Sequence, residues 1–244
     1  MNAILALEDG TWYKGIAIGA NGIASGEVVF NTSMTGYQEV LTDPSYAGQL
    51  VTMTAPQIGN YGVSPADEES REPRVAGFIV REASPISSNW RAQSTLQDYF
   101  VQHNIVAIAD IDTRALTRVL RVAGVMRGVI ATGNTDPLEL VGRAKEIPRM
   151  EGADLVREVT CEAPYEWSEL GPSHGEIENV SFGIKPETRA RKPRRVAAYD
   201  FGIKYNILRL LKSHGCDITV FPASVSAEEI LDYTPHLDGI FLSN

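Results

Sequence analysis

The fold class is decided by residues 196–242, which read VAAYDFGIKYNILRLLKSHGCDITVFPASVSAEEILDYTPHLDGIFL. Apolar strands and amphipathic helices alternate along this stretch and are joined by links of a few residues. The predicted elements are a strand at 196–200, a helix at 204–214, a strand at 217–221, a helix capped by Ser226 and a strand at 239–242. Such repeats are typical of a parallel sheet with right-handed crossovers. The sequence therefore predicts an α/β fold, with any site at the carboxyl ends of the strands.

Residues 1–160 have a different pattern, and we expect them to form a separate domain. Short apolar runs punctuated by glycine and proline predict strands at 3–7, 12–18, 27–31, 50–54 and 77–80. Farther along we predict a helix at 94–103 capped by Ser94, a strand at 105–109, a helix from Asp112 or Thr113 to Gly124, a strand at 125–131 and a helix beginning near Pro137. Prolines and glycines break the pattern at 161–194, which we interpret as a linker before a second domain at 195–244.

Length and charge exclude several classes of protein. The chain has 244 residues, a formal net charge of −9 and 43% hydrophobic residues, as in an ordinary globular protein. Binding of nucleic acid needs a clustered basic surface, and the basic run at 189–195 is short, broken by proline and interpreted as a solvated linker. We find no signal peptide and no apolar run near the roughly 20 residues of a membrane helix. We predict a cytoplasmic protein with no membrane or nucleic-acid partner.

Two segments interrupt the strand-rich region, residues 31–39 and residues 41–46. Both are rich in hydroxyl groups and in residues that form turns. Composition alone allows two interpretations. They are either plain connecting turns, which is the commoner case, or loops that a rigid sheet holds for binding.

The residues that could carry catalysis do not form a complete site in the sequence. Cys161 and Cys216 are interpreted as inert, because neither has a visible base or an electropositive setting. The histidines lack metal-ligand spacing, so we expect no metal. The turn after residue 200 lacks the spaced glycines of a dinucleotide fold. Asp200 and Lys204 lie at this strand-to-helix corner, either as a cap and a solvated lysine or as part of the crevice.

The sequence nevertheless resembles a known family from its first turn to its last residue. The main motifs are GEVVFNTSMTGYQE at residues 26–39 and LTDPSY at residues 41–46. Further matches are IGNYG at 58–62, DEES at 67–70, IADIDTR at 108–114, YDFGIKYNI at 199–207 and DGIFLSN at 238–244. Together they resemble the small, glutamine-hydrolysing chain of carbamoyl-phosphate synthase, most weakly across the predicted linker.

The resemblance implies both a fold and an activity. The expected fold is a swivelling β/β/α three-layer N-terminal domain, followed by an incomplete flavodoxin-like parallel sheet that begins a class I glutamine amidotransferase domain. The subunit would hydrolyse glutamine and pass ammonia to a large chain, which uses ATP and magnesium to make carbamoyl phosphate for arginine and pyrimidine synthesis. The family's nucleophilic cysteine, His–Glu pair and oxyanion loop would lie beyond position 244. The chain would then be the front portion of such a subunit, inactive alone.

Three site residues follow from the resemblance. Ser45, in the Asp-Pro-Ser-Tyr motif, would contact glutamine, and Asp43 and Lys204 would lie near the start of the ammonia path. Two other classes of function stay open. One is a non-catalytic scaffold subunit that only docks on a partner. The other is a receiver-like signalling module, which the strand end Leu242-Ser243-Asn244 disfavours because it offers no aspartate to accept a phosphoryl group.

Overall fold

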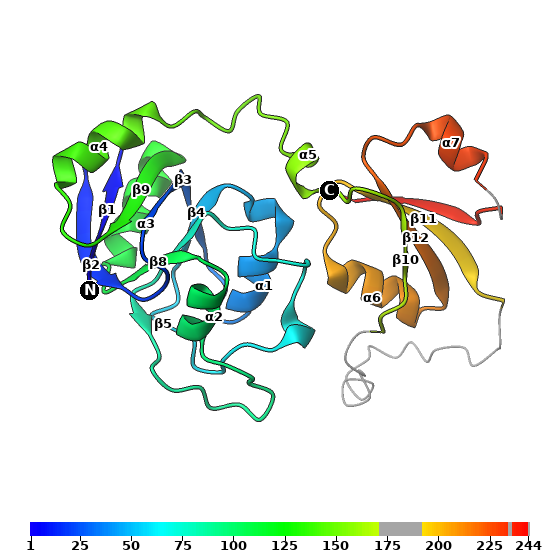
Figure 1. The fold of residues 1–244 in the computed structure, drawn as a ribbon, viewed down its shortest axis with the longest axis horizontal. Coiled ribbons are helices and arrows are strands. Elements are labelled where there is room, and N and C mark those ends of the chain that lie inside the picture. Colours follow the sequence, from blue (N-terminus) through cyan, green and yellow to red (C-terminus); the bar gives the residue numbers. More distant parts are fainter. Residues whose placement is uncertain (171–191, 234–235, 244) are drawn as a thin grey trace. The chain divides into compact units, whose positions relative to one another are not determined.

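The computed structural model describes residues 1–170, 192–233 and 236–243 (Figure 1). The chain divides into two compact units, residues 1–153 and 154–244, and each is described by itself. Most of the expected linker, residues 171–191, lies outside the described residues, as do Arg189 and Arg191 of the basic run and Asn244 at the end of the last motif.

Seven described strands of the first unit close into a barrel in the order β1-β2-β8-β6-β4-β3-β9. Their bounds are β1 (Asn2–Leu7), β2 (Trp12–Ala17), β3 (Ile23–Asn31), β4 (Gln49–Met53), β6 (Gly77–Ile79), β8 (Val106–Ala109) and β9 (Met126–Thr132). The pairs β3–β4, β4–β6 and β6–β8 are parallel, and the remaining pairs are antiparallel. The resemblance implies three layers here, whereas the main sheet closes on itself. A separate parallel pair joins β5 (Gln57–Ile58) to β7 (Glu82–Ala83).

The barrel closes where β2 approaches β8. Ile16 pairs with Ala109, and Ala17 pairs with Ile108. A Cβ atom on Gly15 would lie 2.3 Å from the carbonyl oxygen of Ala109, so a side chain at this position would force the two strands apart.

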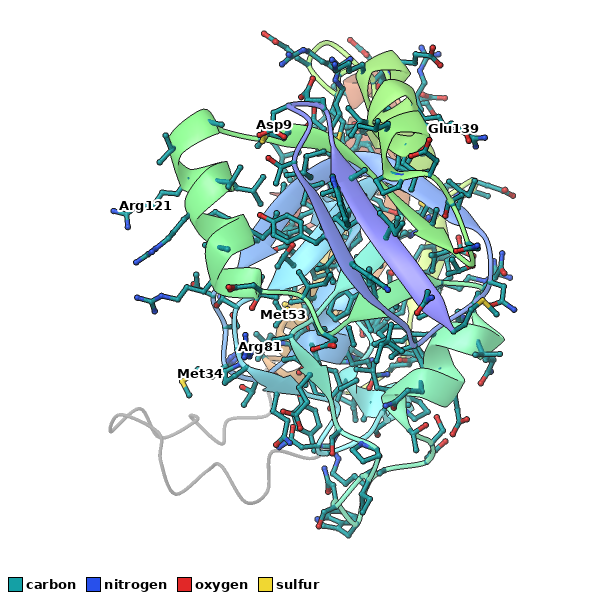
Figure 2. The ribbon with its side chains drawn as sticks, turned by 90° about the vertical axis from the view of Figure 1, so that its left-hand side faces the viewer. Asp9, Met34, Met53, Arg81, Arg121 and Glu139 are labelled. Carbon is teal, nitrogen blue, oxygen red and sulfur yellow. The ribbon has the colours of Figure 1, made fainter. Side chains whose placement is uncertain are left out.

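Helices cover the barrel on different sides. They are α1 (Tyr37–Thr42), α2 (Leu96–Gln102), α3 (Thr113–Ala123), α4 (Pro137–Glu146) and the short 3₁₀ helices η1 (Pro44–Tyr46) and η2 (Pro65–Asp67). α4 packs Leu140 and Ala144 against the outward face of β1 and β9. α3 instead adds Leu116 and Leu120 to the cluster that contains Leu5 of the barrel. Figure 2 shows α3 and α4 flanking the β1–β2 hairpin.

Local capping signals in the sequence predict both ends of α3 and the start of α4 correctly. The Asp112 carboxylate accepts a hydrogen bond from the Ala115 N–H at 2.9 Å, and Gly124, with a φ of 86°, ends α3. The predicted cap of α2 is one residue out. The Thr95 hydroxyl accepts a hydrogen bond from the Asp98 N–H at 3.1 Å and caps the helix. The backbone of Ser94 instead pairs with Val63 in an isolated β-bridge.

Residues 37–46 are not plain connecting turns, which corrects the commoner of the two interpretations. They form α1 and η1, and Tyr37, Val40 and Leu41 are buried in the largest core cluster. Gly36 precedes α1 with a φ of 82° and provides no side-chain cap. A helix of six residues without a capping side chain has almost no local signal, and burial rather than propensity stabilises it.

The second unit contains a sheet of four described strands in the order β10-β12-β11-β13. The three predicted strands, β11 (Arg194–Asp200), β12 (Cys216–Pro222) and β13 (Gly239–Leu242), are parallel as expected. α6 (Tyr205–Ser213) packs on the face that carries Ala198, and α7 (Ala227–Leu231) packs on the face that carries Ala197. Helices therefore cover both faces of this sheet. A short helix, α5 (Val156–Val159), precedes it.

One strand of this sheet lies inside the segment that the sequence indicates as a linker. β10 (Tyr165–Trp167) pairs antiparallel with β12, joining Tyr165 to Val220 and Trp167 to Ile218. Trp167 is 6% exposed and packs in the cluster that contains Leu208. A run of three residues after Pro164 is too short for alternation to predict a strand, so only the tertiary packing identifies it.

Among the described residues, every helix is too short or too polar to cross a membrane.

Candidate functional site

The turn that follows α1 places Asp43 and Ser45 side by side. Asp43 is 8% exposed, and its carboxylate accepts a hydrogen bond from the Ser45 N–H at 2.9 Å, which caps η1. Pro44 occupies the first position of η1, where its fixed φ suits a helical start. The Tyr46 N–H donates to the Asp43 carbonyl at 3.0 Å. Ser45 itself is exposed, so this turn presents its hydroxyl group on a rigid backbone.

The phenol of Tyr46 ties the turn to the end of β3. The Asn31 side-chain amide donates to the Tyr46 hydroxyl at 3.0 Å, and its carbonyl oxygen accepts from the Ser33 N–H at 2.7 Å. Asn31 is the last residue of β3, in parallel register with Met53 of β4. The turn is therefore held at the edge where the parallel strands β3 and β4 end.

Two stacked tyrosines hold the start of α1. The Tyr61 hydroxyl accepts hydrogen bonds from the Gly36 N–H at 2.6 Å and the Tyr37 N–H at 3.2 Å. The Tyr37 hydroxyl donates to the Gly62 carbonyl at 2.6 Å, and the two rings stack with centroids 4.2 Å apart. Tyr61 thus takes the place of the missing side-chain cap, because it satisfies two N–H groups at the helix start.

Thr42 holds the other end of α1. Its hydroxyl donates to the Gln38 carbonyl at 2.9 Å and accepts from the Glu69 N–H at 2.8 Å. Its carbonyl accepts from the Ser70 hydroxyl at 2.6 Å. The IGNYG and DEES motifs therefore contribute the residues that fix α1, a role that sequence analysis missed. Their only signal was their place among the matched motifs, since pairing across more than 20 residues leaves no local pattern.

Carboxylates cluster beside α1. Burial, together with Asp67 and Glu69, raises the pKa of Glu39 above its ordinary value. Arg91 forms an ion pair with Asp67. Its positive charge also lowers the pKa of Glu39 and so opposes part of the increase. This acidic neighbourhood is polar and partly buried, and it favours a cationic or neutral hydrogen-bonding group over an anion.

The remaining predicted residue, Lys204, belongs to the second unit, as does Asp200. Asp200 is 6% exposed, and its carboxylate accepts from the N–H groups of Gly202 at 3.0 Å, Ile203 at 2.8 Å and Cys161 at 2.8 Å. It therefore closes the β11–α6 loop as a capping residue. Lys204 is the N-cap residue of α6 and is partly exposed.

The two cysteines differ from an activated nucleophile. Burial, followed by the charge of Asp200, raises the pKa of the Cys161 thiol to about 11, so the group is protonated near neutral pH. Cys216 is partly buried at the start of β12, where its side chain packs in the apolar cluster around Leu208. Within the described part of the chain, no group of histidine, cysteine, aspartate and glutamate side chains could hold a metal ion.

Comparison with known proteins identifies the family of the chain. The family described as "Carbamoyl-phosphate synthase small chain, CPSase domain" matches residues 5–130, which include the barrel strands from β2 to β8, parts of β1 and β9, α1 and the Ser45 turn. The chain belongs to the carbamoyl-phosphate synthase small-chain family.

Relatives in this family match the chain along its length. The carbamoyl phosphate synthase small chain of Syntrophotalea carbinolica is 54% identical over 245 aligned residues, covering 100% of this chain and 62% of that protein. The small chains of Thermosynechococcus vestitus and Vibrio vulnificus are 51% and 50% identical, covering 99% and 100% of this chain and 61% and 62% of their own lengths. The chain thus spans about three fifths of the curated relatives it matches.

Proposed function

We propose that the chain belongs to a subunit that hydrolyses glutamine and delivers ammonia to a large, ATP-dependent chain for the synthesis of carbamoyl phosphate. Ammonia delivered in this way would serve arginine and pyrimidine synthesis, in the cytoplasm. The observation that carries the proposal is the identity of about half the residues with carbamoyl phosphate synthase small chains along the whole chain. ATP and magnesium belong to the large chain in this proposal.

Ser45 is the proposed contact for glutamine. Ser45 is an exposed residue, while its backbone is fixed by the Asp43 cap and by Pro44. A hydroxyl can both donate and accept, so it can bind the ammonium or the carboxylate of an amino acid. Because the turn is already ordered, little conformational entropy is lost when the contact forms.

The nucleophile of the reaction would come from outside these 244 residues. Amide hydrolysis by a cysteine needs a thiolate, a base and donors for the oxyanion. Cys161 is held protonated and Cys216 packs in an apolar cluster, so neither suits that role. In this proposal Ser45 helps to bind and orient glutamine. The thiolate forms a C–S bond to the side-chain carbonyl carbon, the C–N bond breaks as ammonia leaves with a proton from the base, and water hydrolyses the thioester to glutamate.

Asp43 and Lys204 are proposed to lie near the start of the ammonia path. Asp43 is buried beneath the Ser45 turn. Lys204 begins α6 at the carboxyl end of β11, the edge where α/β proteins place their ligands. On the same grounds we infer that β11, β12 and β13 begin a flavodoxin-like amidotransferase domain, and that the barrel unit corresponds to the swivelling domain implied by the resemblance.

The experiment that tests the proposal is a glutaminase assay on the complete subunit, with and without the large chain. We expect glutamine-dependent ammonia release, coupled to carbamoyl phosphate when the large chain, ATP and magnesium are present. A subunit that binds the large chain but releases no ammonia from glutamine would instead be the non-catalytic scaffold.

A further inference from the structure

One face of α3 carries three arginines. Arg114, Arg118 and Arg121 follow each other at spacings of four and three residues, which places their side chains on one side of the helix. All three are exposed, and we call this set the arginine face of α3. Arg121, labelled in Figure 2, extends from α3 away from the barrel.

The opposite face of α3 fixes the orientation of these arginines. Leu116 and Leu120 are 0% and 4% exposed and pack in the core cluster of the barrel. The Asp112 cap holds the start of the helix, and Gly124 ends it. The arginine face is therefore presented by a helix of 11 residues that Leu116 and Leu120 anchor to the barrel, rather than by a loop.

None of the three guanidinium groups forms an ion pair with another residue in the described ranges. Several other arginines of this unit do: for example, Arg127 pairs with Glu8, and Arg143 pairs with Glu139. Like charges four residues apart destabilise a helix by about 0.2–0.5 kcal/mol.

Apolar surface adjoins the arginines at the end of the helix. Val122 lies four residues after Arg118, on the same side of the helix, and is 90% exposed. Val125, just past the end of the helix, is 52% exposed. Arginine beside exposed apolar groups is the composition of a protein interface, where guanidinium groups bind carboxylates through two parallel hydrogen bonds.

We propose that the arginine face of α3 docks on an acidic surface of the large chain of the synthase. This inference rests on the proposed function, which requires that partner. Charge complementarity argues for an acidic occupant, because guanidinium groups without intramolecular partners bind carboxylates. A protein is favoured over nucleic acid because three charges give few phosphate contacts and the rest of the chain is acidic.

The test reverses the charges of this face in the complete subunit and measures its binding to the purified large chain. The variant R114E/R118E/R121E should bind about ten-fold or more weakly, mainly through a slower association rate. The difference should shrink between about 50 mM and about 300 mM salt, because screening weakens attraction between exposed charges. The variant R114Q/R118Q/R121Q, which keeps good helix formers, should show a smaller loss of affinity and guards against misfolding.

A matched control reverses three basic residues of the same unit outside α3. R143E/K145E/R149E makes the same change in net charge, at three exposed positions in and just after α4. This variant should bind the large chain nearly as well as the wild type. Equal loss in both triple variants, or wild-type affinity in both α3 variants, would overturn the proposal.

Two further outcomes are distinguishable. A wild-type subunit that does not bind the large chain would contradict the proposed function itself. Binding of a short DNA duplex by the wild type, lost in R114Q/R118Q/R121Q, would show that the face takes phosphates rather than an acidic protein and would also overturn the proposal.

Discussion

At Ser45, the backbone stabilises the turn, whereas the side chain is available to contact a ligand. The backbone N–H donates to Asp43 and is thereby fixed, while the side chain is exposed. Within the described residues, no hydrogen bond of the Ser45 hydroxyl competes with a ligand. A residue can therefore be changed here with little effect on folding, which makes Ser45 suitable for a functional test.

Substituting Ser45→Ala in the complete subunit should raise the KM for glutamine several-fold and change kcat less. A neutral hydrogen bond contributes about 0.5–1.5 kcal/mol, and this one would exist in both the ground state and the transition state. Steady-state kinetics with glutamine and with free ammonia check the prediction. Ammonia-dependent synthesis, which needs no glutamine site, should be unchanged. An unaltered KM for glutamine, or an equal loss with ammonia, would contradict the role assigned to Ser45.

Substituting Tyr61→Phe should lower the free energy of unfolding by about 1–3 kcal/mol, because it leaves two partly buried N–H groups without an acceptor. Those groups belong to Gly36 and Tyr37, and the stacked ring would be kept. Urea denaturation measures the change. Tyr13→Phe is the control and should cost less than about 0.5 kcal/mol, since no described hydrogen bond involves the Tyr13 hydroxyl. Equal costs in the two variants would show that the Tyr61 hydroxyl does not hold α1.

Cys161 should resist alkylation until the solution is strongly basic. Burial and Asp200 raise its pKa from the ordinary 9.0 to about 11, so folding favours the neutral thiol. The stabilisation is present below pH 9.0 and is lost as the pH rises through about 11. The rate of iodoacetamide labelling, measured in a Cys216→Ser variant across this pH range, reports the thiolate of Cys161 alone. Rapid labelling of the folded protein at pH 8 would show that the thiol is activated after all.

At the scale of the elements, the sequence predicts what local chemistry encodes. Asp112 and Gly124 bound α3, and Ser226 caps α7 through a capping box with Glu229, because these contacts lie within one helical turn. The sequence fails to predict α1 and β10, which are short and depend on distant partners. Tyr61 lies 24 residues from the Tyr37 N–H that it accepts from, and β10 forms only against β12.

Neutralising the arginine face should stabilise the first unit slightly. R114Q/R118Q/R121Q removes repulsion within α3, and we expect a gain of up to about 0.2–0.5 kcal/mol for each like-charged pair at low salt. Arg143→Gln should act in the opposite direction, because it breaks the ion pair with Glu139. Thermal denaturation at low salt compares the two. A loss of stability in the triple variant would mean that the arginines have partners in the free subunit.

At the scale of the whole molecule, the parallel sheet was predictable and the barrel was not. The parallel direction of β11, β12 and β13 follows from strand–helix repeats with short links, whereas their order, with β11 between β12 and β13, does not. Barrel closure depends instead on β1 meeting both β2 and β9 and on β2 reaching β8 at Gly15. No local pattern in the sequence specifies such distant pairings. The predicted site residues differ in the same way: Asp43 and Ser45 share one turn of the first unit, whereas Lys204 belongs to the second unit.

The way the barrel closes also means that it cannot be completed until late in the translation of the first unit. β1 is translated well before its neighbour β9, as the Glu8–Arg127 pair, 119 residues apart, illustrates. At about 5–20 residues per second, the ribosome needs roughly 6–24 seconds to supply the missing strand. Throughout that interval the nascent chain exposes the edge of β1, which can pair with other strands. The first unit is therefore most vulnerable to misassembly during translation, before β9 emerges from the ribosome.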